Sequence, residues 1–480
     1  WNILTCFLER MVRWGRKWVV FSYYDSGWIE NIRQIISGTE QKFNFIYDNG
    51  GRRERLKSFN GVSLVTETVY GFDNASRLLE MKHLNSLSQI LEQVNYGYDP
   101  NGNRITMNRP SVNLPSPNQV TNTSYNDANQ MLSFNDKNIS YDNNGNMTSV
   151  TNTCGTTTYT WDVRNRLVAI NGFNTDCTAL TASFKYDALG RRIEKAINGV
   201  TIKYLYDGFD IIQELNQDGT IKANYIRGLN IDEPLARIKA DGTIRYYQTD
   251  ALGSVIALTD ENGAIKTQYS YDPFGNVTIT GEASDNPFQF AGRENDNTGL
   301  LYERNRYYSY ELMRYISEDP IGLAGGDVNF YVRTYNSPTN YIDPMGLDFI
   351  TPAEAQKLLN EFKTWLGTPY KTGGSKKGAN GGADCSHSTH QGYTNAGFPY
   401  KYSTTREFAD NDMFKLSPGN TPQVGDVALW KGHMAVYAGN GQIYTAHRPG
   451  GASYSLESLS DWMKYNKVSD PTWFRYYKPD

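Results

Sequence analysis

The segment YGYDPNGNRITM, residues 96–107, contains the pattern that decides the fold. Apolar and polar residues alternate on both sides of Asp-Pro-Asn-Gly, as in two strands joined by a tight turn. From about residue 20 to about residue 300, a similar unit recurs roughly every 20 to 30 residues. The other copies are YDNGGRRERL (47–56), YGFDNASRLLEM (70–81), YDNNGNMTSV (141–150), WDVRNRLVAI (161–170), YDALGRRIEKA (186–196) and YSYDPFGNVTIT (269–280).

Hairpins of this kind must bury their faces against neighbouring hairpins, so we predict a long sheet in which each strand pairs with the next. The composition agrees, because 35 Tyr, 43 Gly and 13% aromatic residues favour strands and tight turns over helices. The clearest exception is LNSLSQILEQ, residues 84–93, for which the apolar spacing predicts a helix. The fold class is therefore mostly β.

The repeats end before DPIGLAGGDVNFYVRTYNSPTNYIDPMGL, residues 319–347, which two Asp-Pro-x-Gly turns frame. Together with GLLYERNRYYSYELMRYISEDP, residues 299–320, and the repeats, this stretch resembles Rhs proteins, the bacterial YD-repeat polymorphic toxins. The resemblance covers about residues 20–347. It implies a YD-repeat β-hairpin spiral shell, or cocoon, over residues 1–300, closed by a core plug over residues 301–347. It also implies that this shell encloses a C-terminal toxin.

The same resemblance implies self-cleavage between Leu347 and Asp348. Two carboxyls that share one proton can hydrolyse a peptide bond, because one activates water while the other polarises the carbonyl. Asp319 and Asp343 are the candidates, and Arg314 is expected to hold one of them ionised. The residues alone allow a second interpretation, in which both aspartates only cap their turns.

After residue 347 the pattern changes, and we expect residues 348–480 to form a separate α+β domain with its own core. Thr351-Pro352-Ala353-Glu354 predicts the start of a helix that runs to about residue 365. Four of the five histidines of the chain lie in this region, which favours a catalytic site here over one in the repeats. These are His387, His390, His433 and His447.

An ordered set of motifs in this domain carries the chemistry. GTPY-x-x-GG begins at residue 367, Asp-Cys-Ser at 384, Val-Gly-Asp-Val at 424 and His-x-x-Val-Tyr-x-Gly-Asn-Gly at 433. Cys385 precedes a predicted helix, whose N-terminus is expected to lower the pKa of the thiol. His433 opens a predicted strand and can serve as the base, and the backbone N–H of Cys385 can stabilise an oxyanion.

This set resembles the NlpC-type cell-wall cysteine peptidases, which have a papain-like fold. The resemblance implies that Cys385 is the nucleophile and His433 the base, with Tyr370 and Asp384 beside the oxyanion hole or the substrate. The family's third polar residue falls at Thr445, but we favour His447, because residues two apart on a strand face the same side. His387 replaces the glycine that the family usually has after Asp-Cys-Ser, so the substrate pocket is expected to differ.

Cys385, His387 and His390 could instead be metal ligands, but on one helix their side chains would diverge, so we predict no metal. The cysteine mechanism requires no cofactor. A formal net charge of −4 implies no nucleic-acid partner. No apolar run reaches the length of a membrane span. Cys154 and Cys177 could pair across neighbouring hairpins.

The chain opens on Trp1 and its first 20 residues do not form a signal peptide, so we expect a fragment of a longer protein. The resemblances predict an antibacterial toxin, secreted or injected, that hydrolyses peptidoglycan stem peptides in the periplasm or cell wall. Its expected partners are its own shell, an immunity protein and an upstream delivery domain or secretion machinery. Two alternatives stay open: a papain-like protease, deamidase or acyltransferase acting on host protein, and a non-enzymatic adhesion or carbohydrate-binding scaffold.

Overall fold

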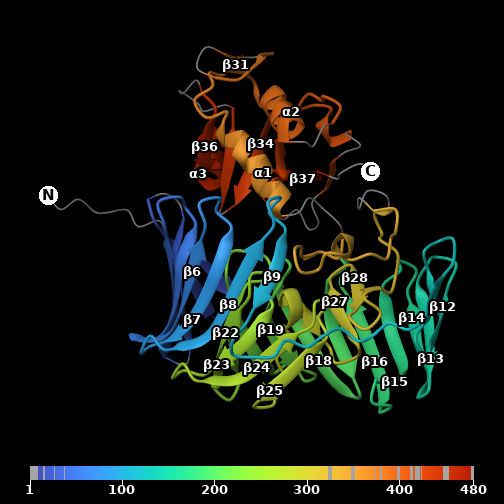
Figure 1. Ribbon diagram of the computed structural model, residues 1–480. Helices are drawn as coiled ribbons and strands as arrows, with labels where there is room; N and C mark the ends of the chain where they lie inside the picture. Colours follow the sequence, from blue (N-terminus) through green and yellow to red (C-terminus); the bar gives the residue numbers. More distant parts are fainter. Residues whose placement is uncertain are drawn as a thin grey trace. The chain divides into compact units, whose positions relative to one another are not determined.

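A computed structural model covers the 480-residue chain (Figure 1). The described residues are 9–14, 17–25, 28–36, 38–322, 327–347, 352–371, 373–378, 381–396, 400–410, 414–416, 422, 424–439, 441–446 and 453–476. The chain divides into two compact units. Unit 1 comprises residues 1–24, 29–320 and 329–347, and unit 2 comprises residues 25–28, 321–328 and 348–480.

Two large antiparallel sheets make up most of unit 1, and in both the strands follow one another in chain order (Figure 1). The first sheet consists of β1 (Glu9–Trp14), β2 (Lys17–Tyr23), β3 (Ile29–Ile36), β4 (Thr39–Tyr47), β5 (Arg53–Asn60), β6 (Ser63–Phe72), β7 (Leu78–Asn85), β8 (Ile90–Tyr98) and β9 (Arg104–Asn108). A connection with prolines at 110, 115 and 117 separates it from the second sheet. Proline lacks the N–H that a ladder requires, which fits a break at this point.

The second sheet has 16 strands. They are β10 (Thr123–Tyr125), β11 (Met131–Phe134), β12 (Lys137–Tyr141), β13 (Met147–Asn152), β14 (Gly155–Trp161), β15 (Leu167–Phe173), β16 (Ala179–Tyr186), β17 (Arg192–Ile197), β18 (Val200–Asp207), β19 (Asp210–Asn216), β20 (Ile221–Arg227), β21 (Pro234–Lys239), β22 (Ile244–Thr249), β23 (Val255–Thr259), β24 (Ile265–Tyr271) and β25 (Val277–Gly281). The predicted sheet of hairpins is thus present as two sheets.

The aspartate of each repeat builds the turn that follows its strand. In the turn after β6, Oδ1 of Asp73 accepts the backbone N–H groups of Ala75 and Arg77, each at 2.9 Å. Its Oδ2 accepts Nε of Arg77 at 2.7 Å. The same arrangement recurs at Asp48, Asp162 and Asp187, each with an arginine four residues later.

The arginine of each such turn also contacts the next repeat. Nη1 of Arg77 donates to the carbonyl of Asp99 at 3.1 Å, and the guanidinium lies 5.3 Å from the ring centroid of Tyr98. The Tyr98 hydroxyl in turn donates to the carbonyl of Leu78 at 2.8 Å. Neighbouring turns are therefore linked by charge, ring stacking and hydrogen bonds, in addition to the strand ladder.

The inner faces of the two sheets pack on each other. Apolar side chains of β2 to β6, such as Phe43 and Val65, share one buried cluster with Ile226, Ile238 and Tyr246 of β20 to β22. The Tyr246 hydroxyl also donates to the side chain of Gln41 at 2.5 Å. The inner face of one sheet is thus buried against the inner face of the other, and this contact forms a core of unit 1.

The predicted helix at residues 84–93 is wrong, because this segment contains the end of β7, the turn at 86–89 and the start of β8. Oδ1 of Asn85 accepts the N–H groups of Leu87 and Gln89, each at 3.0 Å, and Ser88 has a φ of +60°. These contacts are the same turn that the repeat aspartates make. The asparagine side chain closes the turn, whereas the helical spacing of the leucines near it is coincidental.

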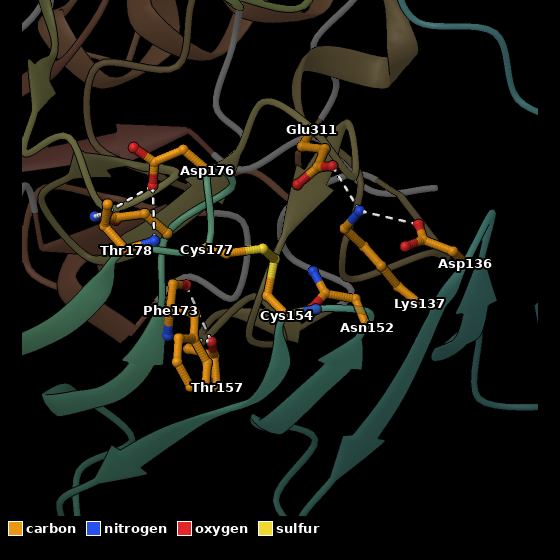
Figure 2. Close-up of a disulfide and its surroundings, with 11 residues drawn as sticks. Asp136, Lys137, Asn152, Cys154, Thr157, Phe173, Asp176, Cys177, Thr178 and Glu311 are labelled. Atoms are coloured by element: carbon orange, nitrogen blue, oxygen red, sulfur yellow. Dashed lines mark hydrogen bonds and ion pairs between the residues drawn. A yellow bond between two sulfur atoms is a disulfide. The ribbon is translucent and has the colours of Figure 1, made fainter.

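A disulfide joins Cys154, in the β13–β14 turn, to Cys177, in the β15–β16 turn (Figure 2). The two Cα atoms are 5.0 Å apart. Close by, the hydroxyl of Thr157 donates to the carbonyl of Phe173 at 3.1 Å and accepts its N–H at 3.0 Å (Figure 2). The pairing across neighbouring hairpins that the sequence left possible is present.

A small sheet of unit 1 carries the plug residues. It consists of β26 (Glu294–Asn295), β27 (Leu300–Glu303), β28 (Arg306–Ser309) and β29 (Arg314–Tyr315). Its Leu300, Tyr302 and Tyr307 pack with apolar side chains of β11 to β16 in one buried cluster. This packing fixes the sheet on the second large sheet.

Unit 2 is an α+β domain. Its helices are α1 (Pro352–Lys363), α2 (Cys385–Ala396) and α3 (Leu459–Asn466). Its six-stranded sheet has the order β32-β37-β33-β34-β35-β36, and β30 (Ser375–Lys376) pairs with β31 (Gly382–Ala383). The six strands are β32 (Phe414–Leu416), β33 (Val427–Trp430), β34 (His433–Gly439), β35 (Gln442–Thr445), β36 (Ser455–Ser458) and β37 (Thr472–Tyr476).

Helices α1 and α2 pack on this sheet around Phe362, Tyr393 and Val436. The predicted helix from residue 352 and the predicted strand 434–439 are both present. Among the helices in the described residues, none has the length and apolarity needed to cross a bilayer.

Candidate functional site

Cys385 is the first residue of α2, and the residue before it fixes the start of that helix. Oδ1 of Asp384 accepts the N–H of His387 at 2.8 Å, as an N-cap side chain does, and the hydroxyl of Ser386 at 2.9 Å. Its Oδ2 accepts the N–H of Gly373 at 2.8 Å. Burial alone would raise the pKa of Asp384, but these hydrogen bonds outweigh it and lower the pKa.

The thiol of Cys385 is buried, with 6% of the residue exposed. Burial raises its pKa to about 11, and the charge of Asp384 acts in the same direction. The backbone N–H groups of Met434, Ser386 and Cys385 lower the pKa by a smaller amount. The expectation of a depressed pKa at the helix start is therefore wrong for the resting site, because the cost of desolvating a thiolate exceeds the effect of the helix.

His433 begins β34, one residue before the Met434 N–H that reaches the thiol. Its Nε2 lies 2.8 Å from the hydroxyl Oγ1 of Thr445. The imidazole stacks on Trp462 of α3, with ring centroids 4.7 Å apart and an angle of 21° between the planes. The hydrogen bond and the stacking hold the ring in one orientation.

The third position of the constellation is occupied by Thr445, at the end of β35. Strands β34 and β35 pair Val436 with Tyr444, so the next residue, Thr445, lies on the face of the ladder that His433 shares. Thr445 is fully buried. His447, which we had favoured for this role, lies outside the described residues.

The backbone of Tyr370 forms a parallel β-bridge with Ala383, the last residue of β31, two residues before Cys385. It packs against the unit 2 core and is partly buried. The bridge places Tyr370 beside the residue that precedes Asp384, and its role at the site stays a prediction.

His387 and His390 lie on α2 beside Tyr402, not around a common centre with the thiol. The ring centroids of His387 and Tyr402 are 4.4 Å apart, and those of His390 and Tyr402 are 5.5 Å apart. Nδ1 of His387 lies 3.0 Å from Oδ1 of Asp384. Within the described part of the chain, no group of three or more His, Cys, Asp or Glu side chains could hold a metal ion.

The two plug aspartates meet at one arginine, although they are 24 positions apart in the chain. Nη2 of Arg306 lies 3.1 Å from Oδ2 of Asp319 and 3.2 Å from Oδ2 of Asp343. Both aspartates are buried, with 6% and 3% of the residue exposed. The guanidinium lies over the ring of Tyr315 at 3.6 Å, and the Tyr315 hydroxyl donates to Oδ2 of Asp343 at 2.6 Å.

The sequence had suggested Arg314 for this contact, and the structure places Arg306 there. Arg314 and Tyr315 are consecutive on β29, so their side chains point to opposite faces. Tyr315 faces Asp343, whereas Nη2 of Arg314 donates to the carbonyl of Asn129 at 2.6 Å. Sequence reasoning missed Arg306, although its place in the short β27–β28 hairpin was a usable signal.

Leu347, the residue before the predicted cut, is buried against the same centre. Its N–H donates to Oδ1 of Asp343 at 2.8 Å, and Nε of Arg306 donates to the carbonyl of Gly346 at 2.5 Å. Asp348 lies outside the described residues. The structure thus brings Asp319, Asp343 and Leu347 together.

Fold and sites define a class of protein: a shell built from aromatic-Asp hairpins and followed by a papain-like cysteine domain. The chain matches the family described as Teneurin YD-shell over residues 18–325 and the NlpC/P60 family over residues 367–471. The first match covers more than half of the chain, so the chain belongs to the teneurin YD-shell family. The second supports a cysteine peptidase or amidase kind of enzyme. Both resemblances drawn from the sequence are confirmed.

The chain is similar to several curated proteins. It is 32% identical over 352 residues to the tRNA3(Ser)-specific nuclease WapA of Bacillus spizizenii, a match that covers 68% of this chain and 14% of the relative. It is 27% identical over 326 residues to the double-stranded DNA deaminase toxin A of Burkholderia cenocepacia, covering 58% and 22%. The chain thus spans only a small part of these relatives, and their named activities differ from one another.

Solved structures show the same fold. The crystal structure of TcdB2-TccC3 superposes with a TM-score of 0.51 at 19% identity, covering 69% of this chain and 21% of that one. The structure of a Photorhabdus luminescens Tc holotoxin pore gives 0.51 at 18% identity, covering 69% and 20%. At this level of identity, the likeness extends to the fold alone.

Proposed function

We propose that the chain is part of a secreted antibacterial toxin whose C-terminal domain hydrolyses amide bonds in peptidoglycan stem peptides. The observation that carries the proposal is the arrangement of Cys385, His433 and Thr445 within a domain that matches the NlpC/P60 family. The relatives named as toxins support the wider role.

In the proposed reaction, His433 is the base. Thr445 holds Nε2, so Nδ1 takes the thiol proton of Cys385 when the substrate arrives. The thiolate attacks the amide carbonyl, the N–H of Cys385 stabilises the oxyanion, and the leaving amine takes the proton from the imidazolium. Water, activated by the same imidazole, then hydrolyses the thioester and restores the thiol. Tyr370 contacts the substrate or assists the oxyanion hole.

A pKa of about 11 for the thiol of Cys385 is compatible with this mechanism, because the thiol transfers its proton during the reaction. The resting thiol is neutral at neutral pH, so the thiolate forms only with proton transfer to His433. The proposed mechanism is therefore closer to that of a serine hydrolase than to that of an enzyme with a preformed thiolate–imidazolium pair.

We propose that the plug hydrolyses the bond between Leu347 and Asp348. One of the two carboxylates, Asp319 or Asp343, removes a proton from water, and the other, protonated, polarises the Leu347 carbonyl, so that the water oxygen adds to the carbonyl carbon. The C–N bond breaks and the new amine of residue 348 takes up a proton. Arg306 offsets the negative charge of the buried pair.

The shell is proposed to enclose the toxin domain, and delivery to require an upstream domain or secretion machinery. The Cys154–Cys177 disulfide supports an oxidising destination outside the cytosol. The producing cell then requires an immunity protein against the released domain. We place the site of action in the periplasm or cell wall.

The enzymatic proposal is tested by Cys385→Ala in the whole chain. We expect loss of amide hydrolysis on purified peptidoglycan, measured as newly released amino groups and by mass spectrometry of the fragments. Asp470→Ala, a change in the loop before β37, is the control. Hydrolysis that persists in the Cys385 variant would contradict the proposal.

Self-cleavage is tested by the intact mass of the wild-type chain and of Asp343→Asn. We expect the wild type to give two fragments that meet between residues 347 and 348, and the variant to stay whole. Asp260→Asn, in a hairpin turn outside the plug, should be cut like the wild type. Equal cutting of the Asp343 variant would mean that the aspartates only shape their turns.

A second candidate is a papain-like effector that acts on host protein in the cytosol. What favours it is that relatives with the same shell are named for intracellular targets, tRNA among them. Directing residues 348–480 to the cytosol or to the periplasm of a test bacterium separates the two. Toxicity confined to the periplasm supports the wall hydrolase, and toxicity confined to the cytosol supports the effector.

A further inference from the structure

Three consecutive residues, the two of the β27–β28 turn and the first of β28, bind three consecutive carbonyls just before the predicted cut. Nη1 of Arg304 donates to the carbonyl of Pro344. Asn305 donates twice to the carbonyl of Met345, from its backbone N–H at 3.2 Å and from Nδ2 at 2.9 Å. The third residue, Arg306, donates to Gly346 as described above. This one-to-one match fixes the register of residues 344–346.

The segment 344–346 has little room to shift along the β27–β28 hairpin. Gly346 adopts a φ of +65°, and a Cβ at this position would lie 2.2 Å from the carbonyl oxygen of Glu303. Met345 and Leu347 are buried on either side of it. Close backbone approach and two buried side chains therefore act together with the hydrogen bonds.

Arg304 is itself held in place from the far side. Its guanidinium makes two contacts with the carboxylate of Asp232, at 2.8 and 2.9 Å. Arg304 also has a left-handed backbone, with a φ of +54°, which turns the chain so that Asn305 faces Met345. A fixed fork is a more precise donor than a mobile one, because less rotamer freedom is lost on binding.

We propose that Arg304 and Asn305 are positioning residues for the self-cleavage, and this inference rests on the proposed function of the plug. They hold the carbonyls of Pro344 and Met345, three and two residues before Leu347, so that the bond after Leu347 lies at Asp319 and Asp343. All of these hydrogen bonds lie on the N-terminal side of that bond. They survive the cut, and the tail of the 1–347 fragment stays in its own site. Each chain therefore cuts itself once, and only in cis.

The positioning role is tested on the full chain by comparing the wild type with Asn305→Ala and Asn305→Asp. Alanine removes one of the two donors, and aspartate sets a carboxylate against the Met345 carbonyl. Pulse-chase translation follows the conversion of the full chain to fragments, and mass spectrometry reads the end of each fragment. Asn101→Ala, an exposed asparagine in the turn after β8, is the matched control.

We expect Asn305→Ala to slow cleavage about tenfold and Asn305→Asp about a hundredfold, as a misplaced reacting bond would. A fraction of the fragments should end one residue away from Leu347, a shift that mere loss of stability would not cause. Cleavage of both variants at the wild-type rate and position would overturn the inference. A wild-type chain that stays whole would instead overturn the proposed self-cleavage.

The cis restriction has its own test. Tagged Asp343→Asn chain is mixed with an excess of wild-type chain that has already been cut, and the tagged chain is followed by electrophoresis. We expect no cleavage of the tagged chain over many half-lives of the cis reaction. Cleavage of the tagged chain would show that the tail leaves the site, which contradicts its retention.

Discussion

The two candidate centres differ in what they are built around. In unit 1, Asp319, Asp343 and Arg306 are buried and the chain that leads to the bond is already hydrogen-bonded in place. In unit 2, His433 is partly exposed and sits at the beginning of a strand, next to a thiol that burial keeps neutral. In the first centre, the proposed substrate is a peptide bond of the same chain. In the second centre, the proposed substrate is another molecule.

This difference shows in how each centre handles charge. Two buried carboxyls are stable together because one guanidinium contacts both, and a tyrosine hydroxyl adds a hydrogen bond. In the proposed reaction, Cys385 instead stays neutral until its proton passes to His433. We infer that the first centre is poised in the folded chain, whereas the second is activated by its substrate.

The largest effects should come from inactivating one centre at a time and measuring both reactions. Cys385→Ala should lower amide hydrolysis at least a thousandfold and leave the formation of the two fragments unchanged, because it removes only the nucleophile of unit 2. Asp343→Asn should do the reverse: the chain should stay whole, while hydrolysis of an added substrate by Cys385 persists. Both variants are compared in both assays. A variant that abolished both reactions would show that the centres depend on each other.

Removal of the disulfide should affect unit 1 and not unit 2. Replacing Cys154 and Cys177 by serine releases a loop closed by residues 23 apart, and we expect unit 1 to lose about 3 kcal/mol of unfolding free energy. Denaturant unfolding followed by tryptophan fluorescence measures the loss, with Thr153→Ser as a control in the same turn. Hydrolysis by unit 2 should not change. An unaltered midpoint for unit 1 would mean that the crosslink carries little of its stability.

A smaller effect is expected at Thr445. Thr445→Val keeps the shape but removes the hydroxyl that holds Nε2 of His433, and we expect kcat to fall about tenfold to hundredfold, less than for loss of the base itself. Thr445→Ser should restore most of the rate, since it restores the hydroxyl. Full activity of the valine variant would mean that another residue, such as His447, orients the imidazole of His433.

The smallest effect is expected in the pH dependence of the alkylation of Cys385. The pKa of Cys385 is raised to about 11 in the folded chain, so the neutral thiol dominates below that pH. Alkylation by iodoacetamide should keep accelerating as pH rises toward about 11, whereas in the denatured chain it should level off near the ordinary thiol value of about 8.5. Because the folded value is the higher one, this thiol favours the folded state at neutral pH, and the benefit is lost in alkali. A folded-state plateau near pH 7 would point to a preformed thiolate.

The sequence predicted the hairpins because period-two alternation and Asp-x-x-Gly turns report directly on backbone geometry. It failed at residues 84–93, where asparagine replaced the usual turn aspartate and leucines happened to have helical spacing. The motifs also located Cys385 and His433. Arg314 was chosen because it lies in the family-like stretch, which also contains Arg306, whereas strand alternation decides which arginine reaches the aspartates. The raised pKa of the thiol depends on burial, which no motif states.

Pairing of each strand with its successor has a consequence for the order of events during synthesis. Every hairpin of unit 1 can form as soon as its second strand leaves the ribosome, because its contacts are local. Asp343 and Leu347 are translated after all of these strands, and the residues around β29 rest on earlier ones, as in the hydrogen bond that the N–H of Met147 donates to the carbonyl of Ile316. The proposed hydrolytic centre is therefore completed last, so the proposed cut would report that the hairpins before it have already folded.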